Sequence, residues 1–98
     1  MSRFTVVVLP GAEADMHEAF LWYFDKSPLA ADAFGTEVDN AIDGLEETAG
    51  DWPKDEDGVS FFHLKHFPYT LRYQIAGKEV VVFAVAHQRR EPGYWGHR

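Results

Sequence analysis

The amino-acid sequence predicts a single α+β domain, in which an antiparallel helical hairpin packs on a mostly antiparallel four-stranded sheet. Three observations predict this class. A run rich in β-branched residues opens the chain, two segments with helical periodicity follow, and three strand-like runs fill the second half. The predicted order is therefore β-α-α-β-β-β. We expect residues 1–98 to form one domain, because the sequence contains no repeat and no interdomain linker.

The first strand is expected at residues 3–9 (RFTVVVL), where a Pro-Gly pair follows and ends it. A helix is expected over residues 12–25, with carboxylates early in the run, where they suit the positive end of the helix dipole. Its apolar stripe consists of Met16, Ala19, Phe20 and Tyr23. Trp22 and Phe24 lie off this stripe, which indicates either burial on more than one side or a groove for a partner.

The second helix is expected to start at Ser27 and Pro28, because serine caps free N–H groups and proline fits the first helical position. It is expected to end near Thr48, with Gly50 as a stop signal. The short link at Ser27 predicts an antiparallel helix pair. One apolar stripe, expected to pack in the core, runs along this helix: Ala31, Phe34, Val38, Ile42 and Leu45.

Three further strands are expected at residues 59–67, 69–75 and 80–86. Pro68 separates the first two, and Gly77 lies in a tight turn before the third. The last run is apolar on both faces, which is typical of a central strand. The middle run alternates, with Tyr69, Leu71, Tyr73 and Ile75 on one face and Thr70, Arg72 and Gln74 on the other.

Charge is distributed unevenly along the chain, whose formal net charge is −7. Residues 1–58 hold fourteen of the sixteen acids and three of the nine bases, whereas residues 59–98 hold two acids and six bases. The overall charge argues against a free nucleic-acid binder. The basic second part leaves two interpretations open: the acidic helices are simply solvated surfaces, or the basic part meets an anionic partner.

The composition excludes several kinds of site. The chain has no cysteine, so neither disulfides nor zinc-thiolate sites can form. His63 and His66 stand three apart on an expected strand and would point to opposite faces, so we expect no metal and no cofactor. The N-terminal apolar run, about five residues long, is too short for a signal peptide or a membrane span. A cytoplasmic location is therefore expected, without membrane contact.

The end of the central strand gathers the residue types that bind anions. His87 is expected to continue the face of Val81, Phe83 and Val85, and Gln88, Arg89 and Arg90 follow it. Arg72 lies on the neighbouring strand. Guanidinium groups bind phosphate or carboxylate through paired hydrogen bonds, and histidine transfers protons near neutral pH. The alternative is that His87 satisfies backbone groups at the sheet edge while the arginines pair with the acidic helices.

Beyond Pro92 and Gly93, the tail carries Tyr94, Trp95 and Arg98. Exposed aromatic residues here could stack on a base or fill a pocket of a partner, whereas buried ones would anchor the tail to the sheet. Burial is favoured for Trp95.

These segments resemble, in order, the RelE/ParE superfamily of toxins from bacterial type II toxin–antitoxin systems. The residues that carry the resemblance are FPYTLRY (67–73), VVVFAVAH (80–87) and HQRREPGYWGHR (87–98), with SPLAADAF (27–34) and AIDGLEE (41–47) upstream. The resemblance covers nearly the whole chain. Each motif alone is loose, and the ordered set is fairly specific.

The resemblance implies a small cytoplasmic toxin that a cognate antitoxin neutralises in a hetero-oligomeric complex. It implies antitoxin contacts at Trp22, Phe24, Tyr69 and Arg72. It also implies a target surface formed by Arg72, His87, Arg89, Arg90, Tyr94, Trp95 and Arg98. RelE-like members cleave mRNA on the ribosome, whereas ParE-like members inhibit DNA gyrase. The strongly acidic first part of this chain departs from what is usual for these toxins.

The resemblance also bears on the choice of branch. RelE-like nucleases carry bases at places that here look like Phe61, His63 and Thr70, and of the matching bases this chain keeps only Arg89. Each lost charge donor at a scissile phosphate costs about 10²–10³-fold in rate. The ParE-like branch is therefore favoured. A reduced nuclease site of His63, His87 and Arg89, or a non-toxic member that only binds its partner, are the alternatives.

Overall fold

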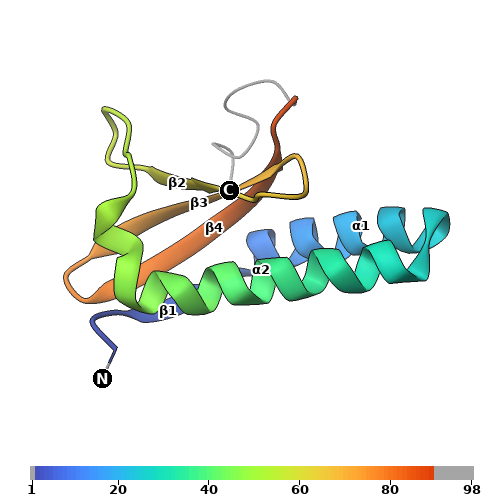
Figure 1. Ribbon diagram of the computed structural model, residues 1–98. Coiled ribbons are helices and arrows are strands. Elements are labelled where there is room, and N and C mark those ends of the chain that lie inside the picture. The colour runs from blue at the N-terminus through green and yellow to red at the C-terminus, as the bar shows by residue number, and fades with distance from the viewer. Residues whose placement is uncertain (1, 90–98) are drawn as a thin grey trace.

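The computed structural model describes residues 2–89 and has the predicted order of elements, with the helices together on one face of a four-stranded sheet (Figure 1). The elements are β1 (Thr5–Val8), α1 (Pro10–Lys26), α2 (Pro28–Thr48), a 3-10 turn (Ala49–Asp51), β2 (Ser60–His63), β3 (Tyr69–Ala76) and β4 (Glu79–His87). No helix in the described part of the chain combines the length and the apolar character that crossing a membrane requires.

The sheet has the strand order β1-β4-β3-β2. β1 runs parallel to β4, and the β4–β3 and β3–β2 pairs are antiparallel. The helical hairpin thus carries the chain from one edge strand, β1, to the other, β2. The predicted α+β class and its mostly antiparallel sheet are confirmed.

Ser27 is the only residue between the two helices, and it serves both of them. Its backbone N–H donates to the carbonyl of Tyr23 (2.7 Å) and so closes α1, while its hydroxyl accepts from the N–H of Ala30 (3.4 Å) at the start of α2. The predicted start of α2 is confirmed. The two expected stop signals lie in helical segments instead: Pro10 belongs to the first turn of α1, and Gly50 lies in the 3-10 turn. β1 is also shorter than the predicted run of residues 3–9. Gly50 is no left-handed stop, because only Gly58 and Gly77 have positive φ among the described residues.

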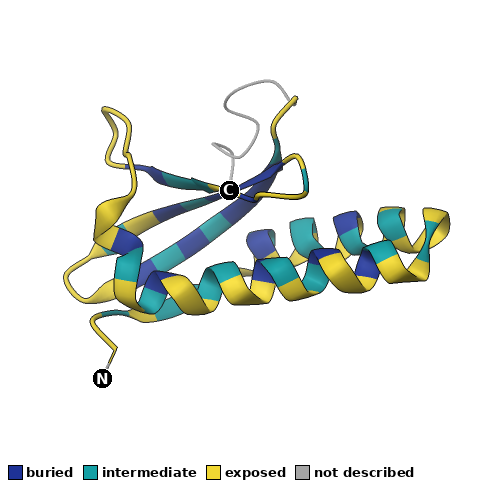
Figure 2. Ribbon diagram, viewed as in Figure 1, coloured by how far each residue is buried: buried dark blue, intermediate teal, exposed yellow. Residues whose placement is uncertain are grey.

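The core lies between the helices and the sheet (Figure 2). Phe34 and Leu45 of α2 pack with Leu71 and Tyr73 of β3 and with the core-facing valines of β4, all essentially inaccessible to solvent: Val80, Val82 and Val85. Burying each such side chain contributes about 1.5–3 kcal/mol. An aromatic cluster extends the core toward the α1–α2 connection, with ring centroids 5.0–6.3 Å apart: Tyr23, Phe34, Phe67 and Tyr69.

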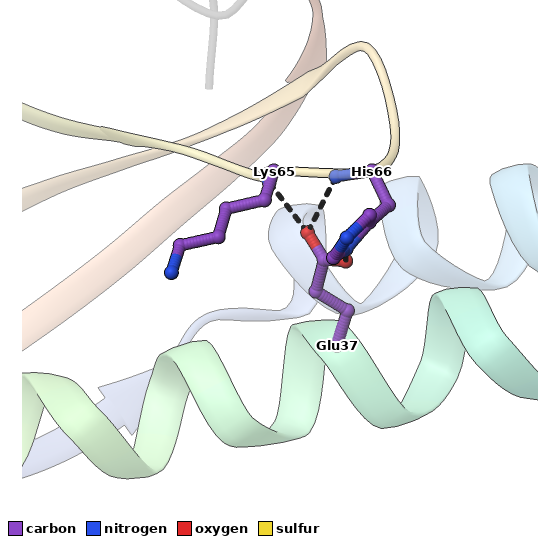
Figure 3. Close-up of polar contacts among 3 residues, drawn as sticks. All are labelled: Glu37, Lys65 and His66. Atoms are coloured by element: carbon purple, nitrogen blue, oxygen red, sulfur yellow. Dashed lines mark hydrogen bonds and ion pairs between the residues drawn. The ribbon is translucent and has the colours of Figure 1, made fainter.

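β2 is shorter than predicted and ends at His63, so residues 64–68 form a loop and His66 is not on a strand. Leu64 turns into the core, and Glu37 of α2 holds the loop (Figure 3). Its carboxylate accepts from the backbone N–H groups of Lys65 (2.6 Å) and His66 (3.2 Å), and it pairs with the His66 ring (2.7 Å). These tertiary contacts outweigh the strand propensity of residues 64–67.

A β-bulge in β4 changes the face on which His87 lies. Arg72 pairs with Ala84 but Tyr73 pairs with Val82, so Phe83 is an extra residue that reverses the alternation. His87 is opposite Tyr69 and lies on the face that the helices cover. Val81 is opposite Gln74 and lies on the other face. The prediction that His87 continues the face of Val81 is therefore wrong.

Candidate functional site

A groove of about 700 Å³ lies between α1 and the last residues of β4. We call it the α1–β4 groove. Carboxylates and exposed apolar side chains of α1 form one wall, and the end of β4 with the residues after it forms the other. Its principal lining residues are Asp15, Glu18, Leu21, Trp22, Tyr69, Val85, His87 and Arg89.

The imidazole of His87 is fixed from two sides. Its ring packs edge-on against Tyr69, with the centroids 5.1 Å apart. Its Nδ1 accepts a hydrogen bond from the backbone N–H of Arg89 (3.1 Å). In the neutral ring the proton is then on Nε2, which is available as a donor. The same bond holds Arg89 at the rim, where its exposed side chain adds a fixed positive charge.

Asp15 joins α1 to β4 inside the groove. Its Oδ2 accepts a hydrogen bond from the backbone N–H of Val85 (2.9 Å). Asp15 follows Ala12 by three residues and precedes Ala19 by four, so it lies on the buried side of α1. Asp15 and Glu18 were not predicted as site residues. A carboxylate within a buried helical stripe is the signal that could have identified Asp15.

α1 exposes large apolar side chains at the groove. Leu21 is 51% exposed and Trp22 is 57% exposed. The Trp22 indole packs edge-on against Tyr23 and carries the Lys26 ammonium 5.3 Å from its ring centroid. Phe24 is 51% exposed but stacks on Phe20, and it is not among the residues that line the groove. Exposed aromatic and aliphatic groups beside a groove are typical of a surface that binds another protein.

The floor of the groove stays uncharged. Tyr69 is 9% exposed and lies beside Tyr23. Burial raises the pKa of Tyr23, and the neighbouring Tyr69 adds to the rise. Both phenol rings therefore act as apolar surface near neutral pH.

The structure separates Arg72 from His87. Arg72 is opposite Phe61 and Ala84, on the face of the sheet that faces away from the helices, and its guanidinium lies 5.0 Å from the centre of the Phe61 ring. His87 lies on the helix face. The prediction that Arg72 and His87 belong to a single anion site is therefore wrong.

His63 lies on the same face as Arg72, because it is opposite Thr70 and its Nδ1 is 2.6 Å from the Thr70 hydroxyl. The sheet thus lies between His63 and His87, and the two imidazoles cannot act on one phosphate from these positions. Of the other predicted target residues, Arg90, Tyr94, Trp95 and Arg98 lie outside the described residues. Within residues 2–89, no three His, Asp or Glu side chains come together as metal ligands would.

Comparison with known proteins gives one family and one fold. The family model described as "ParE toxin of type II toxin-antitoxin system, parDE" matches residues 6–92. A solved structure titled "Chromosomal ParDE TA system from P. aeruginosa" is similar, with a TM-score of 0.77 and 18% sequence identity. The match covers 87% of this chain and 96% of that one. No curated protein matches the sequence.

Proposed function

Because this chain belongs to the ParE toxin family of type II toxin–antitoxin systems, we propose that it arrests growth in the cytoplasm by inhibiting DNA gyrase until a cognate antitoxin neutralises it. The observation that carries the proposal is the family match, which spans β1 to β4 and therefore every element that builds the α1–β4 groove. Toxin and antitoxin form a hetero-oligomer, and neutralisation consists of covering the binding surfaces of the toxin.

The α1–β4 groove is the antitoxin site in this proposal. Trp22 and Leu21 supply the exposed apolar anchors, and Tyr69 supplies the floor. An aromatic anchor near the centre of an interface typically accounts for about 2 kcal/mol or more of the binding free energy. Phe24 and Arg72 point elsewhere and would be reached only by an antitoxin that also covers the far side of α1 and the outer face of the sheet.

The gyrase target is preferred over mRNA because the residues that a nuclease site would need lie on opposite faces of the sheet. Phe61, His63 and Thr70 stand where RelE-like nucleases carry bases, and they lie on the face opposite His87. Arg72 on that face covers the Phe61 ring. With His87 and Arg89 in the groove on the other face, the acid–base partners of a nuclease are divided between two surfaces. His87 and Arg89 suit binding to a protein target. Further contacts with that target are predicted for Arg90, Tyr94, Trp95 and Arg98.

Controlled expression tests the proposal. Expression without antitoxin should stop growth and induce the DNA damage response, and co-expression of the protein encoded by the adjacent reading frame should restore growth. New 5′ ends within translated messages during the arrest would instead identify a ribosome-dependent nuclease. Undiminished growth at high expression of the folded protein would overturn the toxin function and leave a module that only binds its partner.

The antitoxin site has its own test. Trp22→Ala should weaken binding of the antitoxin by about 30-fold or more, measured by calorimetry. Leu29→Ala is the matched control, because Leu29 is 80% exposed at the start of α2 and lines none of the grooves described. Equal affinities of the two variants would remove the groove from the antitoxin interface.

A further inference from the structure

Phe24 of α1 is a large aromatic residue that the α1–β4 groove does not include. Its side chain is 51% exposed and stacks on Phe20, one turn earlier in the helix, with the ring centroids 6.1 Å apart. Met16 precedes Phe20 by a further four residues, so the three side chains form one apolar row along α1. Phe24 is the exposed end of this row, and an exposed apolar row is typical of a surface that another molecule covers.

A hollow of about 210 Å³ lies next to this row, between α1 and α2, which run side by side (Figure 1). Met16 and Phe20 line it from α1, and Phe34, Gly35 and Val38 line it from α2. A β-carbon at Gly35 would have the Phe20 ring as its nearest neighbour, at 4.0 Å, so the missing side chain leaves the hollow open. The hollow is large enough and apolar enough to accept a phenyl ring.

The apolar row and the α1–β4 groove lie on opposite flanks of α1. Trp22, which lines the groove, is two residues from both Phe20 and Phe24, and two residues correspond to about 200° around a helix. A molecule that covers Phe24 and the hollow therefore leaves the groove open.

The row and the hollow are complementary to each other, which favours a second copy of the chain as the molecule that covers them. If two α1 helices lie antiparallel, Phe24 of each copy reaches the hollow of the other, and one contact is made twice about a two-fold axis. The same alignment brings Asp25 of one copy beside His17 of the other, and both side chains are exposed. It also places the negative end of each helix dipole beside the positive end of the other.

We infer that this chain forms a two-fold symmetric homodimer through the flank of α1 that carries Phe24, with the Phe24 ring of each copy in the hollow between α1 and α2 of the other. A single helix pair buries less surface than the roughly 800 Å² per partner of a standard interface, so we expect a dissociation constant of about 10–100 μM. The formal net charge of −7 repels the two copies, and salt that screens this repulsion strengthens the dimer. The dimer requires neither the antitoxin nor the growth target.

Sedimentation equilibrium of the purified chain in about 0.3 M salt measures the dissociation constant of the dimer. Phe24→Ala should raise it by about 10-fold or more, because the ring that fills the hollow is lost. Leu29→Ala is the control, because it removes an apolar side chain that is 80% exposed and lies outside the row and the hollow, and it should change the constant less than about 2-fold. A chain that stays monomeric up to about 1 mM, or equal effects of the two substitutions, would overturn the dimer.

Gly35→Leu closes the hollow without removing apolar surface. Leucine is a better helix former than glycine, so this variant should unfold at a temperature at least as high as the parent protein. The dissociation constant should nevertheless rise by about 10-fold or more, because Phe24 of the other copy no longer finds space. Unchanged dimerisation of the folded Gly35→Leu variant would overturn the place assigned to the Phe24 ring.

The orientation of the two helices is tested by disulfide cross-linking, because the chain has no cysteine of its own. The variants His17→Cys and Asp25→Cys are mixed under oxidising conditions. Antiparallel helices bring position 17 of one copy within disulfide reach of position 25 of the other, so pairs of one variant with the other should predominate. Pairs of like with like, or no cross-linked pairs, would overturn the antiparallel arrangement.

Discussion

At the scale of single residues, Asp15 supplies the hydrogen-bond acceptor that a neighbouring strand usually supplies. The N–H of Val85 lies where β1 no longer accompanies β4, and a buried backbone donor without an acceptor is costly. The carboxylate of Asp15 accepts this bond from across the groove. This bond ties α1 to the end of β4 across the groove.

Removal of this carboxylate should destabilise the fold. Asp15→Ala leaves the Val85 N–H without its acceptor and should lower the free energy of unfolding by about 1–3 kcal/mol. Asp15→Asn retains a carbonyl oxygen and should recover most of the loss. Urea unfolding measures both variants, with Glu13→Ala on the exposed side of α1 as control. An Asp15→Ala variant as stable as Glu13→Ala would contradict this role.

Tyr73 offers a second prediction, which concerns alkaline pH. Its side chain is fully buried and its hydroxyl donates to the carbonyl of Ala49 (2.7 Å). Burial, together with the nearby charge of Asp51, raises the pKa of Tyr73 to about 12 against a hydrogen bond with Ser60 that lowers it. The unfolded chain ionises near pH 10, so the stabilisation is complete below pH 10 and is lost as the pH rises toward 12.

Tyr73→Phe should therefore cost about 1–2 kcal/mol at pH 7, because the Ala49 carbonyl loses its donor. At pH 11 the difference from the parent protein should be smaller, because phenylalanine does not ionise. Urea unfolding at the two pH values measures it. A difference that stays constant would mean that Tyr73 does not ionise on unfolding in this range.

The residue scale also marks where sequence reasoning failed. The alternation of β3 could be predicted: Tyr69, Leu71 and Tyr73 share one face as predicted, and the structure shows that this face is the core. The bulge at Phe83 could not be predicted, because residues 80–86 are apolar on both faces and their pattern does not indicate which residue is extra. A shift of one residue moves a side chain to the other face. This is why Arg72 and His87 were wrongly combined into one site.

At the scale of elements, local signals predicted helix starts better than strand ends. Ser27 and Pro28 act through neighbouring backbone groups, so the start of α2 could be predicted. The end of β2 depends on Glu37, which is far away in the sequence. The α1–β4 groove likewise depends on residues far apart in the sequence, because Asp15 and Val85 meet only in the folded chain.

The contact between Glu37 and loop 64–68 should depend on pH. Burial raises the pKa of Glu37, but hydrogen bonds from the His66 ring and from the backbone of His66 and Lys65, with the charge of His66, outweigh it and hold the pKa below its ordinary value of 4.5. A lowered folded pKa gives stability that is complete above the unfolded pKa and is lost as the pH falls through the folded one.

Glu37→Gln should lower the free energy of unfolding by about 1–2 kcal/mol at pH 7, because a charge-assisted set of hydrogen bonds becomes neutral. The difference from the parent protein should narrow below pH 4.5, where the carboxylate takes up a proton. Urea unfolding between pH 3 and pH 7 measures this, with Asp43→Asn on exposed α2 surface as control. A difference in the free energy of unfolding that widens as the pH falls would contradict the lowered pKa of Glu37.

At the scale of the whole molecule, the two layers differ in charge. The helical hairpin has ten carboxylates and one lysine, and the described sheet has only one carboxylate, Glu79. Within residues 2–89, ion pairs join Lys26 to Asp25 of α1, and Glu37 of α2 to His66 of loop 64–68. Like charges concentrated on one layer repel one another and also attract cationic partners over a distance. The composition predicted this polarity, but the fold was needed to place it beside the groove.

This polarity predicts how association with the antitoxin depends on salt. If the segment that enters the α1–β4 groove is basic, the acidic layer should accelerate its approach, and the association rate constant should fall by about 10-fold between 50 mM and 500 mM salt. The dissociation rate should change less, because apolar contacts at Trp22 are short-ranged. Stopped-flow mixing of the two purified proteins measures both rates. An association rate that is independent of salt, or that rises with it, would show that the incoming segment does not carry the opposite charge.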